Sequence, residues 1–326
     1  QMTETLSATG LDGLVAPGAR LERIGSGYRF TEGPVWSADE QALYFSDIPG
    51  DTRWRWTEAG GMEVHRTPCD KANGLVIDRD GELVACDQVT SRVVRYRRDG
   101  GTEVLAFHHR GEYLNSPNDI VVRGADGAIY FTDPDYGRWN DWIGQERTRG
   151  RFRGLYRVPA HGGDGEAELL VAEDEFDQPN GLCFSPDESL LYVNDTPRAH
   201  IKVFDVAPDG TLSNGRVLRA GIGMTQDKVE AATAGLSEAE RHRVLHDAGA
   251  LDGMKCDERG NVWTTGPGGV WVLSPDGEEI GRLRTPEVAG NLTWGGPDLR
   301  TLFVMTTSTV HALRTLVGPA TLPHHR

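Results

Sequence analysis

Six oxygen-bearing side chains stand at similar points of a repeated sequence pattern, each just before a short apolar stretch. They are Glu32, Asn73, Asn118, Asn180, Asp252 and Asn291. If the chain brings them together, the two carboxylates repel one another and destabilise the fold unless a cation neutralises them. Carboxylate and amide oxygens without His or Cys favour a hard cation such as Ca²⁺, Mg²⁺ or Mn²⁺, with Zn²⁺ as an alternative. The residue types therefore indicate one divalent-cation site.

A repeated unit positions these residues. Each unit has the marked residue, an alternating strand, an Asp/Gly-type turn and a second alternating strand, followed by a third. The units open with EGPVW, NGLVID, NDIVV, NGLCF, DGMKC and NLTW, and they start 41, 45, 62, 72 and 39 residues apart. Three or four short strands in a unit of about 40–50 residues are typical of a propeller. We therefore predict an all-β chain, a six-bladed β-propeller with a helical insertion between blades 4 and 5.

Propeller geometry explains why the six side chains should meet. The innermost strand of every blade lines the central channel, so equivalent positions lie at one level around the axis. Turn formation is the competing explanation for Asn and Asp at these repeat positions. It does not explain Glu32, because Glu is a poor turn former. We expect one propeller domain at 20–315, in which 21–30 supplies a strand that completes the last blade and closes the ring. Residues 1–19 are expected to form a flexible arm, and 316–326 a C-terminal tail.

The two long intervals locate insertions at 136–153 and 221–249. In the second, Ser237 and Glu240 form a capping box that predicts a helix running to about His246. The first insertion is rich in tryptophan and arginine: Trp139, Trp142, Arg147, Arg149, Arg151 and Arg153. Long loops in compact domains are typically lids or binding loops, and an oligomer contact is the alternative. A basic, aromatic lid favours an anionic or aromatic substrate, unless the arginines only offset an acidic surface.

The composition argues against several classes of partner. With 34 Lys and Arg against 49 Asp and Glu, the formal charge of −15 disfavours nucleic acid and anionic membrane. The four cysteines lack CxxC spacing, and the sequence has neither a signal-type segment nor a run of about 18 apolar residues. We therefore expect a cytoplasmic protein with reduced thiols and a small-molecule substrate. A closed propeller is self-sufficient as a monomer, although the helical insertion offers a dimer contact.

The ordered motifs resemble a known family. They are TEGPVW at 31–36, NSPNDI at 115–120, YFTDPDYG at 130–137, PNGLCFSPDE at 179–188, LDGMKCD at 251–257 and NLTWGGPD at 291–298. Over about residues 20–315 the chain resembles the regucalcin/gluconolactonase family, also called senescence-marker-protein-like. The members of that family are six-bladed, metal-dependent lactonases.

The resemblance implies a role for several of the marked residues. Glu32, Asn180 and Asp252 correspond to metal ligands, and Asn118 to a fourth ligand or a partner of bound water. The implied reaction is hydrolysis of a lactone, with the cation polarising the carbonyl group and with water activated by the metal or by Asp252 as general base. The remaining marked residues are not implied as ligands and are expected to line the substrate pocket: Asn73 and Asn291.

Other side chains are candidates for substrate contact. Asp133 and Tyr136 lie in the FTDPDYG segment that leads into the first insertion, where they would meet substrate at the top face. His109 either enters the pocket or stays at the surface, and Asp119 either orients Asn118 or serves only its blade. The chain has no GxSxG elbow, and no Cys stands beside a convincing His/Asn pair, so a nucleophilic mechanism has little support.

Three classes of function stay open on the sequence alone. The first is hydrolysis of a sugar-acid or aromatic lactone. The second is another metal-assisted reaction on the same scaffold, such as phosphotriester hydrolysis or a biosynthetic cyclisation or ring opening, because one fold hosts several chemistries. The third is a calcium-binding propeller without catalysis. The motifs favour the first class and do not decide which lactone is cleaved.

Overall fold

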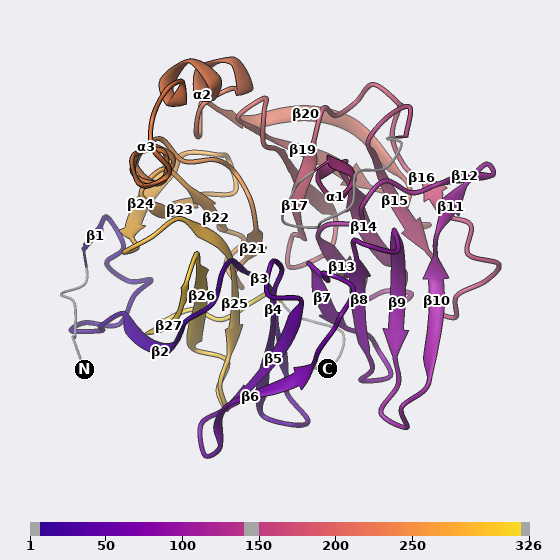
Figure 1. The fold of residues 1–326 in the computed structure, drawn as a ribbon, viewed down its shortest axis with the longest axis horizontal. Coiled ribbons are helices and arrows are strands. Elements are labelled where there is room, and N and C mark those ends of the chain that lie inside the picture. The colour runs from indigo at the N-terminus through magenta and orange to yellow at the C-terminus, as the bar shows by residue number, and fades with distance from the viewer. Residues whose placement is uncertain (1–6, 140–149, 321–326) are drawn as a thin grey trace.

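The chain folds into antiparallel sheets arranged as six blades around a central axis (Figure 1). The structure is a computed structural model that describes residues 7–139 and 150–320. The innermost strands of successive blades contact one another, and the last of them contacts the first, so the ring is closed. The predicted six-bladed β-propeller is confirmed.

Each of the first three blades has four strands, given from the axis outwards. Blade 1 comprises β3 (Thr31–Ser37), β4 (Ala42–Asp47), β5 (Thr52–Thr57) and β6 (Gly61–Arg66). Blade 2 comprises β7 (Leu75–Ile77), β8 (Leu83–Asp87), β9 (Arg92–Tyr96) and β10 (Thr102–Ala106). Blade 3 comprises β13 (Ile120–Val122), β14 (Ile129–Asp133), β15 (Gly154–Val158) and β16 (Glu168–Leu169). A separate hairpin precedes blade 3, with β11 (His108–His109) and β12 (Glu112–Tyr113).

The last three blades include the strands contributed by the N-terminal part of the chain. Blade 4 comprises β17 (Pro179–Phe184), β18 (Leu190–Asp195), β19 (His200–Val206) and β20 (Leu212–Ala220). Blade 5 comprises β21 (Met254–Cys256), β22 (Val262–Gly266), β23 (Gly269–Leu273), β24 (Glu279–Arg284) and a fifth strand, β1 (Ala8–Thr9). Blade 6 comprises β25 (Ala289–Gly295), β26 (Thr301–Thr306), β27 (Thr309–Arg314) and β2 (Glu22–Ser26).

Strand β2 closes the ring as expected. It pairs antiparallel with β27, with Glu22 opposite Ala312 and Ser26 opposite Thr309. Because β2 comes from the start of the chain and β27 from its end, this pairing ties the two ends into one sheet. It also covers what would otherwise be an open edge of β27.

The blades meet closely because glycine follows most of the marked residues. A Cβ atom on Gly33 would lie 1.9 Å from the backbone oxygen of Asn73, and one on Gly181 would lie 2.2 Å from the oxygen of Asp252. Neither distance is sterically allowed, so a side chain at these points would push neighbouring blades apart. The Glu-Gly and Asn-Gly pairs of the repeat therefore combine a functional side chain with a close backbone contact.

The N-terminal arm is packed rather than flexible over the part that the structure describes. Strand β1 pairs with β24, and Leu11, Leu14 and Val15 are buried in a cluster with apolar side chains of blades 5 and 6. The expectation of a flexible arm was wrong for residues 8–19. Burial of these apolar side chains stabilises the packed arm by more free energy than the loss of its conformational entropy costs. The tail is also docked up to Ala320, whose N–H donates to the carbonyl of Cys256 at 2.9 Å.

The second insertion contains two helices, α2 (Gln226–Thr233) and α3 (Glu238–Ala248). Ser237 and Glu240 form the reciprocal capping box that was predicted, and α3 runs two residues beyond His246. Nε2 of His246 lies 2.9 Å from the carbonyl oxygen of Thr285, which docks the helix beside blade 5 (Figure 1). Of the first insertion the structure shows α1 (Tyr136–Trp139), while Trp142, Arg147 and Arg149 lie outside the described residues.

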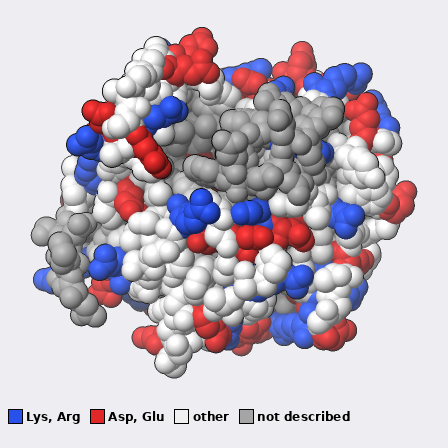
Figure 2. Space-filling model, in the orientation of Figure 1, with Lys and Arg blue, Asp and Glu red and all other residues white. Residues whose placement is uncertain are grey.

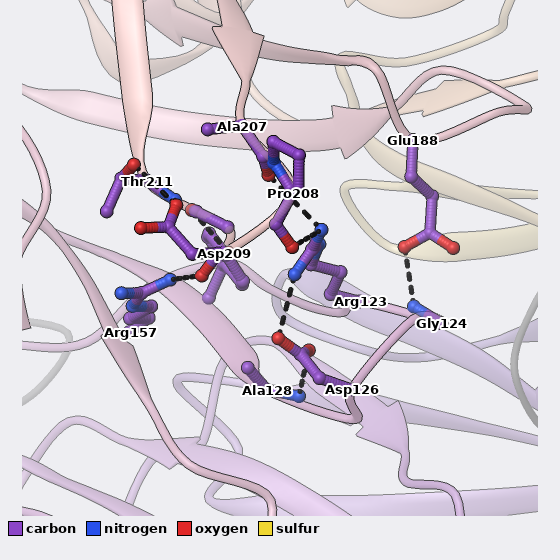
Figure 3. Close-up of polar contacts among 12 residues, drawn as sticks. Arg123, Gly124, Asp126, Ala128, Arg157, Glu188, Ala207, Pro208, Asp209 and Thr211 are labelled. Carbon is purple, nitrogen blue, oxygen red and sulfur yellow. Dashed lines mark hydrogen bonds and ion pairs between the residues drawn. The ribbon is translucent and has the colours of Figure 1, made fainter.

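Polar contacts join blades 3 and 4 at the turn between β19 and β20 (Figure 3). The guanidinium of Arg123 donates to Asp126 at 2.8 Å and to the carbonyls of Ala207 and Pro208 at 3.3 and 3.0 Å. Arg157 on β15 donates to the carbonyl of Asp209 at 2.7 Å. We call these contacts the blade 3–4 junction. They hold one blade to the next through charge-assisted hydrogen bonds.

Acidic and basic side chains are interspersed over the face shown in Figure 2. The net charge of −15 therefore does not form one uninterrupted acidic field on that face. Within the described ranges, no helix has the length and apolar character needed to cross a membrane.

Candidate functional site

Five of the six marked residues open the innermost strands of successive blades. Hydrogen bonds across the blades bring their backbones together: the N–H of Gly74 donates to Asn118 O at 2.8 Å, and that of Gly181 to Asp252 O at 3.1 Å. A β-bulge interrupts the ladder at the start of β3 and of β17. Bulges of this kind redirect a side chain out of the normal alternation. We call these five residues the axial ring: Glu32, Asn73, Asn118, Asn180 and Asp252.

The two carboxyl groups of the axial ring are in direct contact. Glu32 is 2% exposed and Asp252 is half-buried, and their carboxyls share a hydrogen bond. Burial, and after it the charge of Asp119, raises the pKa of Glu32 to about 7, against hydrogen bonds from Asp252, Asn291 and Gly33 that lower it. Burial, followed by the charge of Glu32, raises the pKa of Asp252 well above its ordinary value. Two acids held this closely favour a shared proton or a bound cation.

Three amide oxygens of the axial ring have no hydrogen-bond partner although they are buried. They are the Oδ1 atoms of Asn73, Asn118 and Asn180. The orientation of Asn180 is fixed, because its Nδ2 donates to Thr196 Oγ1 at 3.2 Å, which leaves Oδ1 as the unpaired end. A buried acceptor without a donor costs about 1–3 kcal/mol. Such atoms call for an explanation, and a ligand that accepts their lone pairs is one.

The donor set of the axial ring fits a hard divalent cation. It combines two carboxylates with unpaired amide oxygens, which are the ligands that Ca²⁺ and Mg²⁺ take in proteins. Within residues 7–139 and 150–320, no group of three or more His, Cys, Asp and Glu side chains is placed to hold a metal. Amide oxygens must therefore complete any site at this position, and three are available.

Asn291 does not occupy the equivalent position that the repeat suggested. The N–H of Gly253 donates to Gly290 O at 2.8 Å, just as the N–H of Gly181 donates to Asp252 O. Gly290 is therefore the counterpart of the axial ring residues, and Asn291 lies one residue further along β25. The bulge between Ala289 and Asn291 makes this offset invisible in the sequence pattern.

Asn291 nevertheless contacts the axial ring from the next layer of the channel. Its Nδ2 donates to Glu32 Oε2 at 2.9 Å, and its Oδ1 accepts from Lys255 Nζ at 3.1 Å. Because Oδ1 is held by the ammonium group, the amide can present only its NH₂ group to Glu32. Lys255 was not predicted from the sequence, where its one signal is a charge between the apolar residues Met254 and Cys256. The far end of the channel is lined mainly by apolar side chains, with Pro319 and Ala320 in its wall.

Tyr136 lies close to the axial ring, as its place in the FTDPDYG motif suggested. Its hydroxyl hydrogen-bonds to Thr196, and the charges of Asp252 and Asp195 act on it. Burial is the first cause of its raised pKa. Thr196 also donates to the carbonyl of Leu251 at 2.7 Å, so it joins Tyr136, Asn180 and the residue before Asp252. Sequence analysis did not single out Thr196, which has no distinctive motif.

His109 and Asp133 contact other groups. Nδ1 of His109 lies 2.7 Å from the carbonyl oxygen of Ala167, and its ring packs against Tyr156. Asp133 is buried and accepts the N–H of Asn115 at 2.8 Å. The two side chains line a small cavity of about 20 Å³ beside the β11–β12 hairpin. The structure thus groups them with each other, outside the hydrogen bonds that join the axial ring.

Asp119 follows Asn118 and points into the same channel. One carboxyl oxygen accepts the N–H of Ile120 at 2.9 Å, and the other is buried without a partner. Burial raises the pKa of Asp119, and the charge of Lys255 opposes that rise. Asp119 therefore adds to the negative charge around Glu32 and Asp252, and Lys255 offsets part of it.

Comparison with known proteins agrees with this fold. Residues 30–308 match the family model described as the SMP-30/Gluconolactonase/LRE-like region. A gluconolactonase of Zymomonas mobilis is 30% identical over 325 residues, covering 94% of this chain and 84% of that protein. The pentonolactonase XacC of Haloferax volcanii is 28% identical, covering 85% and 81%. A solved gluconolactonase structure from Xanthomonas campestris has a TM-score of 0.79 at 28% identity, covering 96% and 94%. The chain belongs to the SMP-30/gluconolactonase/LRE-like family.

Proposed function

We propose that the protein is a lactone hydrolase that binds one divalent cation at the axial ring. The observation that carries this proposal is the pairing of the Glu32 and Asp252 carboxyls beside buried amide oxygens that have no partner. Glu32, Asn180 and Asp252 would hold the cation, with Asn118 as a fourth ligand or a partner of bound water. The oxygen-only donor set favours Ca²⁺, ahead of Mg²⁺, Mn²⁺ or Zn²⁺.

When bound, a divalent cation supplies a Lewis acid that polarises the lactone carbonyl and stabilises negative charge on its oxygen. Asp252 acts as the general base that takes a proton from the attacking water. A bond forms between the water oxygen and the carbonyl carbon, the ring C–O bond breaks, and the proton passes to the departing ring oxygen. The half-buried position of Asp252 suits this role, because the carboxyl can meet both the axial ring and the substrate.

Two groups beside Asp252 would bind and orient the substrate. The Tyr136 hydroxyl lies next to Thr196 and near Asp252, where its oxygen can accept from a substrate hydroxyl. The free Oδ1 of Asn73 can accept from a substrate hydroxyl. Asn291 serves the site through Glu32 rather than by lining a pocket. The contacts of His109 and Asp133 support no substrate role for them.

Sugar-acid lactones are the favoured substrate class. The relatives described above are named gluconolactonase and pentonolactonase, and each aligns with more than four-fifths of this chain. A polar axial ring with free acceptor oxygens also suits a substrate rich in hydroxyl groups better than an aromatic one.

The test is cation-dependent acid release from a panel of lactones. Chelator-treated protein is supplied with Ca²⁺, Mg²⁺, Mn²⁺ or Zn²⁺ and mixed with glucono-δ-lactone, a pentonolactone or an aromatic lactone. Acid release is followed with a pH indicator, and spontaneous hydrolysis is subtracted. We expect turnover of the sugar lactones only when cation is present. Absence of turnover across the panel, with cation bound, would reject the proposal and favour a binding protein or a different metal-assisted reaction.

A further inference from the structure

A second group of buried charges lies between blades 1 and 2, on the outward side of the strands rather than at the axis. Arg53 on β5 is 0% exposed, and none of its three side-chain nitrogens has a hydrogen-bond partner. Its guanidinium lies over the ring of Tyr96 on β9, at 4.4 Å from the centroid. Such stacking is worth about 2 kcal/mol when desolvated, whereas a buried charge without a partner costs several. The aromatic contact therefore does not compensate the burial of this cation.

An acid whose charge interacts with that of Arg53 does not neutralise it. Asp87 at the end of β8 is buried, accepts the Tyr96 hydroxyl at 2.5 Å and leaves its other oxygen without a partner. Within the described chain, no ion pair shorter than 4 Å joins Arg53 to a carboxylate. Burial raises the pKa of Asp87 to about 7, although the Tyr96 hydrogen bond and the charge of Arg53 lower it. At neutral pH the carboxyl carries only part of a negative charge.

A cavity of about 290 Å³ opens in front of Arg53. Its wall combines the cationic and aromatic side chains of Arg53, Arg66, Arg97, Arg98, His65, Tyr44 and Tyr96 with the carboxylate of Glu40. That carboxylate accepts the Tyr44 hydroxyl at 2.6 Å and lies 3.5 Å from Nε of Arg55. Arg97 is paired with Glu103 at 2.6 Å, and Arg98 with Asp39 at 3.0 Å. Arg66 is exposed and lies over the same Tyr96 ring, 4.9 Å from its centroid. The cavity is just under the size of typical small-molecule sites, which begin at about 300 Å³.

We propose that this cavity binds a small oxyanion, the carboxylate or phosphate group of a molecule no larger than a sugar acid. A guanidinium offers a planar pair of N–H groups that matches the oxygens of either anion. Arg53 would supply those donors from the floor of the cavity, and the flexible side chain of Arg66 would move aside and close over the ligand. The tyrosine rings would pack against its apolar part. The site is separate from the axial ring, so the inference does not depend on the proposed lactone hydrolysis.

The binding test compares two anions on chelator-treated protein, so that cation at the axial ring does not contribute. Inorganic phosphate and gluconate are titrated by calorimetry against the wild type, with sodium chloride of equal ionic strength as the blank. We expect one of them to bind with millimolar affinity or better, and Arg53→Met to weaken it at least ten-fold. The anion that binds identifies phosphate or carboxylate as the recognised group. Arg216→Met, which removes an exposed arginine paired with Asp205, is the matched control and should bind like the wild type.

Thermal unfolding distinguishes a loss of anion binding from a change in the stability of the variant itself. Without added anion, Arg53→Met should be as stable as the wild type or more stable, because it removes an uncompensated charge. With saturating anion, the wild type should become more stable than Arg53→Met, because only the wild type is expected to bind the anion tightly. Equal anion binding by Arg53→Met would overturn the proposal. The proposal would also be overturned if Arg53→Met were less stable than the wild type with and without anion, and if Asp87→Asn lost the same stability. Arg53 would then serve only as the partner of Asp87.

Discussion

The axial ring and the blade 3–4 junction differ in how many of their buried polar atoms have hydrogen-bond partners. At the junction, Arg123 is 5% exposed, and two of its nitrogens have acceptors on Asp126, Ala207 and Pro208 (Figure 3). In the axial ring, two carboxyls are pressed together and three amide oxygens have no donor. Paired groups stabilise the fold, whereas unpaired ones cost stability and are expected where a ligand will bind. The axial ring therefore differs from the junction by a cluster of unpaired oxygens on several residues, whereas Arg123 leaves a single nitrogen, Nε, unpaired.

This contrast makes opposite predictions for the two regions. Substitution in the axial ring should remove activity or cation binding while leaving the cation-free fold as stable as before. Substitution at the junction should destabilise the fold while leaving the chemistry of the folded molecules intact.

The largest effect is expected for Asp252→Asn. Loss of a general base lowers the rate by a factor of about 10²–10⁴, and we expect about 10³ for lactone turnover at saturating cation. The isosteric amide removes one of two adjacent acids, so thermal stability without cation should be equal or higher. Turnover is measured with the pH indicator, and stability by thermal unfolding. Asp298→Asn, at an exposed ion pair with Arg314, is the control. Undiminished turnover in Asp252→Asn would exclude its role as the base.

Glu32→Gln should remove most of the stabilisation that a cation gives. A ligand at 100 times its dissociation constant stabilises the folded state by about 2.7 kcal/mol. We expect the wild type to show such a shift between chelator and excess Ca²⁺, and Glu32→Gln to lose most of it. Thermal unfolding under both conditions measures the shift. If both proteins gain equally from Ca²⁺, the cation binds somewhere other than the axial ring.

At the junction, Arg123→Met should lower the free energy of unfolding by about 2–3 kcal/mol. The substitution removes charge-assisted hydrogen bonds and leaves the carbonyl of Pro208 without a donor, while that of Ala207 still accepts the N–H of Gly210. Denaturant unfolding measures the loss, and kcat is compared at a temperature where both proteins are folded. We expect kcat to change less than two-fold. A fall in kcat as large as that of an axial ring variant would mean that the junction is not purely structural.

Lys255→Met should give the smallest effect, about a ten-fold fall in kcat/KM, which corresponds to about 1.4 kcal/mol. The ammonium group orients Asn291, which in turn donates to Glu32, so the side chain acts by positioning. Lys255→Arg keeps the charge and a donor and should recover part of the loss. Thr293→Val, another residue of the channel wall, is the control. If Lys255→Met is as active as the wild type, Asn291 holds Glu32 without help.

Arg53 belongs with the axial ring in this comparison rather than with the junction. Both Arg53 and Arg123 are buried arginines beside a neighbouring blade, but only Arg123 finds acceptors there. The difference follows from what faces each guanidinium. Arg123 meets the backbone carbonyls of a turn, whereas Arg53 meets an aromatic ring.

Much of the fold could be predicted because local patterns repeat. The alternating strands and their turns defined all six blades, and the strand at the N-terminal end closed the ring as expected. The capping box at Ser237 and Glu240 gave the start of α3, because both of its hydrogen bonds lie within four residues. Helix α2 was missed, since its N-cap Thr225 makes no side-chain capping bond that a motif would reveal.

Four features of the site and its surroundings depended on contacts between distant segments. The offset of Asn291 arises from a bulge in β25, which the sequence does not mark. The contact of Lys255 with Asn291 joins neighbouring blades, and that of Thr196 with Leu251 does the same. The packing of the N-terminal arm depends on an apolar surface made by blades 5 and 6 together.

The sequence by itself determined which residues open five of the six blades, because repeat position and strand alternation are local properties. In blade 6 the bulge in β25 shifted Asn291 by one residue. The sequence also determined the oxygen-only chemistry of the axial ring. Only the tertiary structure decided which of those oxygens stay unpaired, how Asn291 reaches Glu32 and why Arg53 has no partner. Each of these depends on what a neighbouring blade presents across a gap of a few ångströms, and that is set by packing rather than by the order of residues along one strand.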